Sequence, residues 1–128
     1  MSGLDKILHV DVWSKLHPAT KLVIKILQHV RSKVDDMAEV RVSIGDDNEI
    51  LVSTHKSSIY IAKNLIEFKR KTGNDIRVQR AKVELNNELI DVIKKSILDI
   101  VEHDADPDYE TIVNIFENHF NRNGDRVG

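Results

Sequence analysis

The chain has 128 residues and a formal net charge of −2, and it is 41% hydrophobic, 31% charged and 5% aromatic. A chain of this length can fold as one domain around an aliphatic core, without a disulfide or a structural metal. It contains no cysteine, which excludes a disulfide scaffold, a thiol nucleophile and every cysteine-ligated metal site. We find no signal peptide and no run of about 18 apolar residues, so we expect a cytoplasmic protein that does not contact a membrane.

The first part of the chain predicts helices followed by a β-hairpin. Residues 3–16 fit either a helix or a strand, because their apolar residues recur every four positions but also alternate with polar ones; we favour the helix. Pro18 begins a second helix that runs to about Asp36, with apolar residues at the 3.6-residue period. Every second residue is apolar on both sides of the loop at 45–48, which predicts a hairpin over residues 39–52.

The middle of the chain predicts a helix followed by a third strand. Ser57 or Ser58 can cap a helix that ends at Gly73, where a C-terminal glycine in the left-handed region is favoured. The strand begins at Ile76. Its apolar positions change parity near Gln79–Arg80, which indicates either a β-bulge or two separate strands.

The C-terminal part predicts two more helices. Asn86 or Asn87 caps a long helix that runs to about Glu102, and Asp106–Pro107 begins the last helix. Residues 121–128 contain almost no apolar side chain, so we expect a disordered tail there. The elements together predict one α+β domain over residues 1–120. It has a small, mainly antiparallel sheet of three or four strands, with four or five helices packed on one face and at one end.

The order helix, hairpin, helix, strand over residues 18–82 resembles that of KH-type RNA-binding modules, most closely in residues 62–66 and 71–78. Those modules clamp the nucleic-acid backbone with a GxxG loop. The corresponding residues in this chain are Ser57-Ser58-Ile59-Tyr60, without a glycine. We therefore do not assign the chain to that family.

Positive charge gathers between Lys56 and Lys82. This segment contains eight basic and two acidic residues, whereas residues 83–128 contain four basic and eleven acidic ones. Such a segregated charge suits an anionic partner. The alternative is that these cations complement a helix C-terminus and cover the solvated face of a sheet. The residues that we expect to bind a phosphate or a nucleic acid are Lys63, Arg70, Arg77, Arg80 and Lys82.

The helix predicted from residue 88 to 102 carries more apolar residues than one contact surface normally needs. Either the neighbouring helices cover the excess, or it forms an interface with another chain. In the second case we expect Ile90, Ile97 and Val101 to lie in the interface.

Metal-binding and catalytic patterns are weak. His103, Asp104, Asp106 and Asp108 lie close together, but Tyr109 stands where a calcium loop needs glycine. The sequence has no GxSxG, HExxH or phosphate-binding glycine loop, so we assign no catalytic residue, metal ligand or cofactor.

The sequence therefore predicts a non-catalytic binding or regulatory protein that acts through protein–protein contacts, with a homodimer as one form. The alternative is nucleic-acid or phosphate-ligand binding through residues 56–82. An enzyme is the third option, without residues that we would assign to it.

Overall fold

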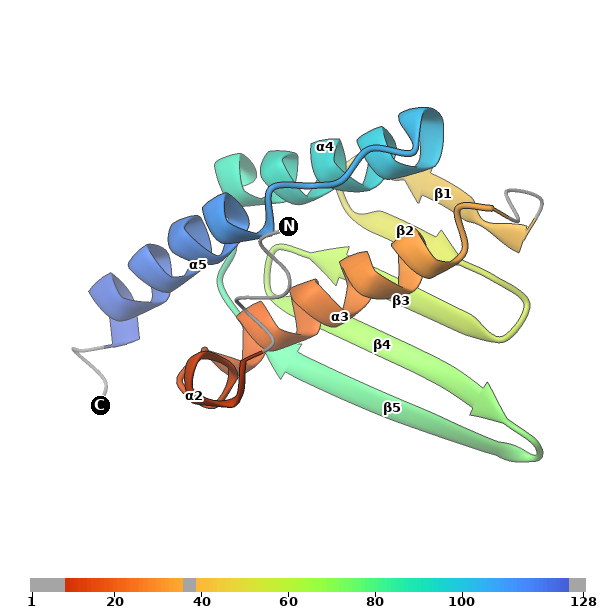
Figure 1. The fold of residues 1–128 in the computed structure, drawn as a ribbon, viewed down its shortest axis with the longest axis horizontal. Coiled ribbons are helices and arrows are strands. Elements are labelled where there is room, and N and C mark those ends of the chain that lie inside the picture. The colour runs from red at the N-terminus through yellow and green to blue at the C-terminus, as the bar shows by residue number, and fades with distance from the viewer. Residues whose placement is uncertain (1–8, 36–38, 125–128) are drawn as a thin grey trace.

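The computed structural model describes residues 9–35 and 39–124 and shows an α+β fold (Figure 1). The described part contains four helices and one five-stranded sheet, so the predicted fold class is confirmed, with one or two strands more than expected. In chain order the elements are α2 (Val10–Trp13), α3 (Pro18–Ser32), β1 (Arg41–Ile44), β2 (Ile50–Ser53), β3 (Ser57–Ala62), β4 (Leu65–Thr72), β5 (Asp75–Lys82), α4 (Asn87–His103) and α5 (Tyr109–Gly124).

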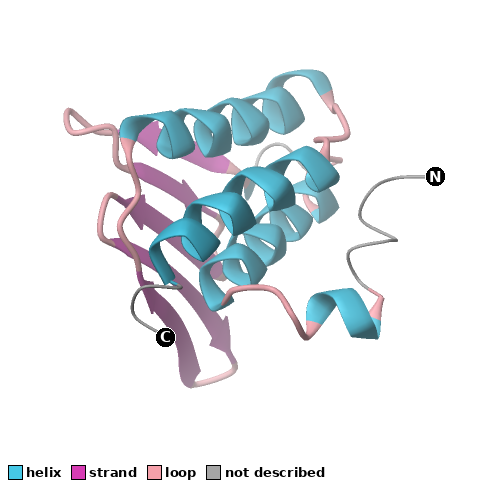
Figure 2. Ribbon diagram, turned by 90° about the vertical axis from the view of Figure 1, so that its left-hand side faces the viewer, coloured by secondary structure: helices cyan, strands magenta, loops and turns pink. Residues whose placement is uncertain are grey.

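The sheet is a meander in which each strand is antiparallel to the next, in the order β1-β2-β3-β4-β5. Helices α3, α4 and α5 lie on one face of the sheet, which we call the inner face (Figure 2). No helix of the described residues covers the opposite, outer face. Helix α3 contacts β4 and β5 and also packs against α4 and α5.

The core lies between the inner face of the sheet and the helices. Ile50, Ile61 and Ile66 are directly opposite one another in neighbouring strands, and all three are fully buried. They meet the buried apolar stripe of α3, which has the helical period that the sequence predicts. The predicted helix from Pro18 and the predicted hairpin at 39–52 are thus confirmed.

The prediction of a helix between Ser57 and Gly73 is wrong, because residues 57–72 form the hairpin of β3 and β4. Burial alternates along β3, and its β-branched and aromatic residues favour a strand. The turn at residues 63–64 restarts this alternation in β4, and that restart produced the three- and four-residue spacings taken for a helix. The element order consequently does not follow that of a KH module.

The predicted bulge or break near Gln79–Arg80 is also wrong. Strand β5 pairs with β4 in one regular register, from Thr72 opposite Asp75 to Leu65 opposite Lys82. The apolar positions change parity because the side chains of Ile76 and Val78 lie on the exposed outer face, whereas Ala81 lies on the inner face.

The ends of the chain differ from the prediction in extent. Within the ambiguous region at residues 3–16, α2 is helical, and residues 1–8 lie outside the described residues. Helix α5 continues to Gly124, four residues into the predicted tail at 121–128. Residues 125–128 lie outside the described residues.

A hydrogen-bonded arginine joins α3 to the loop between α4 and α5. Nη1 of Arg31 donates to the backbone oxygens of Asp104 and Ala105 and to Oδ1 of Asp104, at 3.1, 3.0 and 2.9 Å. Its Nη2 lies 3.1 Å from Oδ1 of Asp106. The sequence predicts Asp106 as the cap of the last helix, but Asp106 binds this arginine instead. Helix α5 begins at Tyr109, and Asp108 caps it, because its Oδ1 accepts a hydrogen bond from the backbone N–H of Thr111.

The cap of α4 agrees with the prediction, since Oδ1 of Asn86 accepts a hydrogen bond from the backbone N–H of Leu89 at 2.9 Å. Among the described residues, no helix is both long and apolar enough to span a bilayer.

Candidate anion-binding site

A cleft of about 1310 Å³ opens between α3 and the ends of β4 and β5 that lie nearest their connecting turn. The turn between β2 and β3 forms a third wall. Six lysine and arginine residues contribute to the lining of this basic cleft: Lys25, Lys33, Lys56, Arg70, Lys71 and Arg77.

The positive charge of the basic cleft is not neutralised within the described part of the chain. Glu39 is the one acidic residue in its lining, and Oε1 of Glu39 lies 3.6 Å from Nδ1 of His55. None of the six cationic side chains forms an ion pair with another described residue. The cleft therefore has an electrostatic potential that attracts anions.

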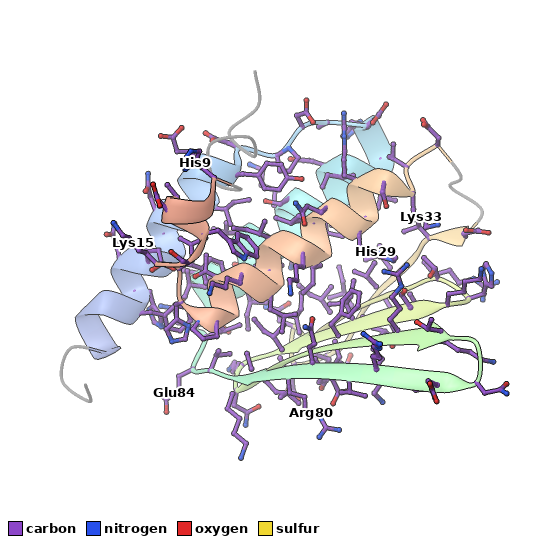
Figure 3. The ribbon with its side chains drawn as sticks, turned by 60° about the horizontal axis from the view of Figure 1, so that its bottom comes forward. His9, Lys15, His29, Lys33, Arg80 and Glu84 are labelled. Carbon is purple, nitrogen blue, oxygen red and sulfur yellow. The ribbon has the colours of Figure 1, made fainter. Side chains whose placement is uncertain are left out.

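Helix α3 contributes one row of side chains to the cleft. Lys25 and His29, four residues apart in α3, lie along one side of the helix, and Lys33 follows as its C-cap residue. Figure 3 shows His29 and Lys33 on the side of α3 that faces the sheet. Helix α3 thus holds these three side chains opposite the strands.

Burial and neighbouring cations both lower the pKa of His29. Burial lowers the pKa of His29 below its ordinary value of 6.5, and the neighbouring positive charges of Lys33 and Arg70 lower it further. The ring lies edge-on to Phe68, with 5.9 Å between ring centroids, and Nε2 is buried without a hydrogen-bond partner among the described residues. The neutral form of His29 is therefore favoured, mainly by burial and further by the two neighbouring cations.

Strands β4 and β5 bring two arginines directly opposite each other. Arg70 pairs across the strands with Arg77, and Ser57 of β3 is the other neighbour of Arg70. Like charges directly opposite each other destabilise a sheet by a few tenths of a kcal/mol to about 1 kcal/mol. This arrangement is unfavourable in the free protein and becomes favourable when an anion lies against both guanidinium groups.

The turn that carries Lys56 is fixed by hydrogen bonds. The hydroxyl oxygen of Thr54 accepts hydrogen bonds from the backbone N–H groups of Lys56 and Ser57, at 3.3 and 3.1 Å. The backbone N–H of Lys71 donates to the carbonyl oxygen of Lys56 at 2.7 Å. Lys56 and Lys71 consequently lie close together at one end of the cleft.

The five cations predicted to form one face do not all lie together. Arg70 and Arg77 line the basic cleft, whereas Arg80 and Lys82 lie on the outer face of β5. Figure 3 shows Arg80 on the side of the sheet opposite His29. Lys63 lies in the turn between β3 and β4, at the other end of β3 from Lys56.

Two of the outer-face cations are occupied by a carboxylate. Nε of Arg80 donates to Oε2 of Glu67 at 2.6 Å, and Nζ of Lys69 lies 3.4 Å from Oε1. The hydrogen bond from Arg80 is the main cause that lowers the pKa of Glu67. Arg80 is therefore less available to an anion than Arg70 or Arg77.

The sequence analysis missed Lys25, Lys33, Lys56 and Lys71 as members of the site. The four-residue spacing of Lys25, His29 and Lys33 was visible as a polar side of a helix. Spacing alone does not say which element a polar side faces. Its position opposite β4 and β5 depends on tertiary packing.

The three residues expected in a protein interface lie within the helical layer. Ile90 and Ile97 are fully buried within the chain, and Val101 is partly buried. Helix α4 packs against α3 and α5, so the neighbouring elements cover most of its apolar side chains, as the alternative interpretation expected. Four of the exposed apolar side chains, Leu51, Tyr60, Ile76 and Val78, lie on the outer face of the sheet.

The acidic residues near the start of α5 have structural partners. Asp104 and Asp106 bind Arg31, and Asp108 caps α5. In the part of the chain that the structure describes, no three histidine or carboxylate side chains converge as metal ligands.

No known protein family, curated protein or solved structure matches the chain. The function is therefore inferred from the geometry and charge of this structure.

Proposed function

We propose that the protein binds nucleic acid through the basic cleft. The observation that carries this proposal is the gathering of six lysine and arginine residues around one cleft from three separate parts of the chain, without an ion-pairing partner among the described residues. Lysine and arginine contacts to phosphates supply most of the affinity of a protein for nucleic acid.

The size of the cleft favours a polymer over a small phosphate compound. Sites for small molecules enclose roughly 300–1,000 Å³ and bury most of their ligand. The basic cleft is larger, at about 1310 Å³, and five of its six cations belong to exposed residues. A phosphate backbone that runs along the cleft can contact α3 on one side and β4 and β5 on the other.

A salt titration tests the proposal. If four or five phosphates are neutralised, the logarithm of the affinity falls against the logarithm of the salt concentration with a slope of about −4. Fluorescence anisotropy with a labelled DNA of mixed sequence measures this slope. No binding at low salt, or a flat response to salt, would contradict the proposal.

Variants locate the binding surface. Lys25→Gln and Arg77→Gln each remove one cation of the basic cleft, from opposite walls, and each should reduce the salt slope by about 1. Lys95→Gln is the matched control, because Lys95 is an exposed lysine of α4 outside the cleft lining. Equal effects of all three substitutions would assign the binding to net charge and not to the cleft.

Protein–protein interaction, including a homodimer, is the second candidate function. It is favoured by the apolar side chains on the outer face, of which Ile76 is 65% exposed and Val78 42% exposed. Sedimentation velocity over a range of concentrations tests self-association, and Ile76→Ser with Val78→Ser should abolish it. A monomer at every concentration rules out the homodimer.

The proposed role is binding without catalysis, with no cofactor, and the proposed location is the cytoplasm. A chain without cysteine suits a reducing compartment.

A further inference from the structure

The ends of β4 and β5 around their connecting turn form a ribbon that is exposed on both faces. Every residue from Lys69 to Arg80 is exposed, although this segment includes half or more of each strand. Figure 1 shows the turn of this hairpin beyond the end of α3, and residues 72–75 extend past β3. Closer to the core, Lys69 and Arg70 pair with Ser58 and Ser57 of β3, and the backbone N–H of Lys71 donates to the carbonyl oxygen of Lys56. We call residues 69–80 the basic ribbon.

The tip of the basic ribbon is narrow and unobstructed. A two-residue turn, Gly73–Asn74, connects the strands, and Gly73 has the positive φ of 61° that such turns favour. A side-chain carbon added at Gly73 would meet no atom within 4 Å. The tip can therefore enter a confined space without striking the rest of the protein.

The composition of the basic ribbon matches a nucleic-acid partner. Its charged residues are five cations and one carboxylate, Asp75. The cations alternate between the two faces, with Arg70 and Arg77 inside and Lys69, Lys71 and Arg80 outside. Thr72, Asn74 and Gln79 add uncharged groups that can donate and accept hydrogen bonds.

The dimensions match one groove of a double helix. Two paired strands lie about 4.8 Å apart, and residues 72–75, the part of the ribbon that passes β3, extend for about 7 Å. The major groove of B-form DNA is about 12 Å wide and about 8.5 Å deep, and it admits a two-stranded β-ribbon. The basic ribbon can thus reach the base edges while its flanking cations contact the phosphates.

We propose that the nucleic acid is double-stranded DNA and that the basic ribbon enters its major groove. This inference rests on the proposed function and names the partner of the same site. One phosphate backbone lies in the basic cleft, between the ribbon and the cations Lys25 and Lys33 of α3. The other backbone faces Lys71 on the outer side of the ribbon, and Thr72 and Asn74 at the tip reach the base edges.

Single-stranded nucleic acid fits the ribbon less well. Proteins that bind single strands stack the bases on aromatic side chains. Residues 69–80 contain no aromatic residue. Phe68, the ring next to the ribbon, lies edge-on against His29 on the inner face and is only partly exposed.

Double-stranded RNA also fits less well. Its major groove is deep and narrow and does not admit side chains to the bases, and its minor groove is shallow. A projecting ribbon about two strands wide suits the wider groove of DNA.

The first experiment compares nucleic acids of one sequence and length by fluorescence anisotropy at one salt concentration. The full chain is titrated with double-stranded DNA, single-stranded DNA and double-stranded RNA. We expect double-stranded DNA to bind about tenfold more tightly than either of the others, because it alone offers both the groove and the two backbones.

The second experiment identifies the groove by methylation protection. Guanine N7 lies in the major groove, and adenine N3 lies in the minor groove. We expect the bound protein to protect guanine N7. Lys71→Gln should reduce the salt slope for double-stranded DNA by about 1, and the control Lys95→Gln should leave it unchanged.

The outcomes separate the two proposals. Tighter binding of single-stranded DNA or of double-stranded RNA, or protection of adenine N3 alone, overturns the groove inference and leaves nucleic-acid binding by the cleft intact. Absence of binding to all three polymers overturns both proposals. Binding of an acidic protein in place of the nucleic acids also overturns both.

Discussion

Reversing the charge of one arginine in the basic cleft should stabilise the free protein and weaken its binding. Arg70 and Arg77 are directly opposite each other on β4 and β5, and both are exposed. Arg77→Glu converts a repulsive pair into an attractive one. Cross-strand charge pairs contribute roughly 0.2–1 kcal/mol, so we expect the free energy of unfolding to rise by about 0.5–1 kcal/mol. For a domain of this size, that change corresponds to an increase in Tm of about 2–5 °C.

The same substitution should reduce the affinity for DNA. It removes one phosphate contact and places a carboxylate in a cleft that otherwise has Glu39 as its acidic lining residue. The salt slope should fall by about 1, and the affinity near 0.1 M salt should fall about tenfold or more. Urea unfolding and fluorescence anisotropy on the same preparations measure the two effects.

Opposite signs for stability and affinity are the diagnostic result. Arg77→Gln, which only removes the repulsion, should give a smaller gain in stability. Lys95→Glu makes the same change in net charge on the exposed side of α4 and should leave the salt slope nearly unchanged. It is a control for affinity alone, because the new carboxylate stands four residues from both Asp91 and Asp99 and should lower the stability. If Arg77→Glu lowers the stability, or lowers the affinity no more than Lys95→Glu does, the functional interpretation of the arginine pair is refuted.

Three further outcomes test the fold that holds the site. Arg31→Ala removes the hydrogen bonds that join α3 to the loop after α4, so the free energy of unfolding in urea should fall by about 1–2 kcal/mol; no loss would contradict that role. Ile97→Ala should cost about 2–4 kcal/mol, because this fully buried side chain leaves a cavity, and Ile97→Asp should unfold the chain instead of giving a folded monomer in sedimentation. Burial is the main cause that lowers the pKa of both His17 and His29, so the unfolded chain binds more protons below their ordinary pKa of 6.5. The free energy of unfolding should therefore be highest above pH 6.5 and decrease as the pH falls below that value. Urea unfolding at pH 7.5 and pH 5.5 measures this difference, and an equal or higher free energy of unfolding at pH 5.5 would contradict the reasoning.

Elements with a sustained period could be predicted from the sequence. Helix α3 shows its 3.6-residue stripe over four turns, and the hairpin of β1 and β2 alternates on both sides of a polar loop. The region of β3 and β4 failed for a specific reason. Two short alternating strands joined by a two-residue turn place Ile61, Leu65 and Phe68 at helix-like spacings. Serines before an apolar run are also compatible with a helix cap, so a local pattern could not decide between the two structures.

The site was predicted in part because charge density is visible in a sequence and its arrangement in space is not. The excess of cations over residues 56–82 pointed to Arg70 and Arg77, which line the basic cleft. The prediction also included Arg80 in the site. It placed Arg70 on a helix and Arg80 on the following strand, and a helix and a strand can present their side chains to one surface. In the meander these two arginines lie on opposite faces of one sheet. The cations of α3 join the site only through the packing of that helix across β4 and β5.

Protection of a sheet edge is a rival explanation for the charges on β5. Edge strands rich in lysine and arginine resist pairing with another chain. This explanation accounts for Arg80 and Lys82, which lie on the exposed edge strand. It does not account for Arg70, because β4 has a partner strand on each side. Nor does it account for Lys25 in α3 or Lys33 at the C-cap of that helix. Charge of one sign on α3, β4 and β5 around a common cleft is what an extended anion requires. Lys25 and Lys33 therefore distinguish the two explanations. If the charges only protect the sheet edge, Lys25→Gln and Lys33→Gln should not change the affinity for DNA. If DNA binds in the cleft, each substitution should lower that affinity.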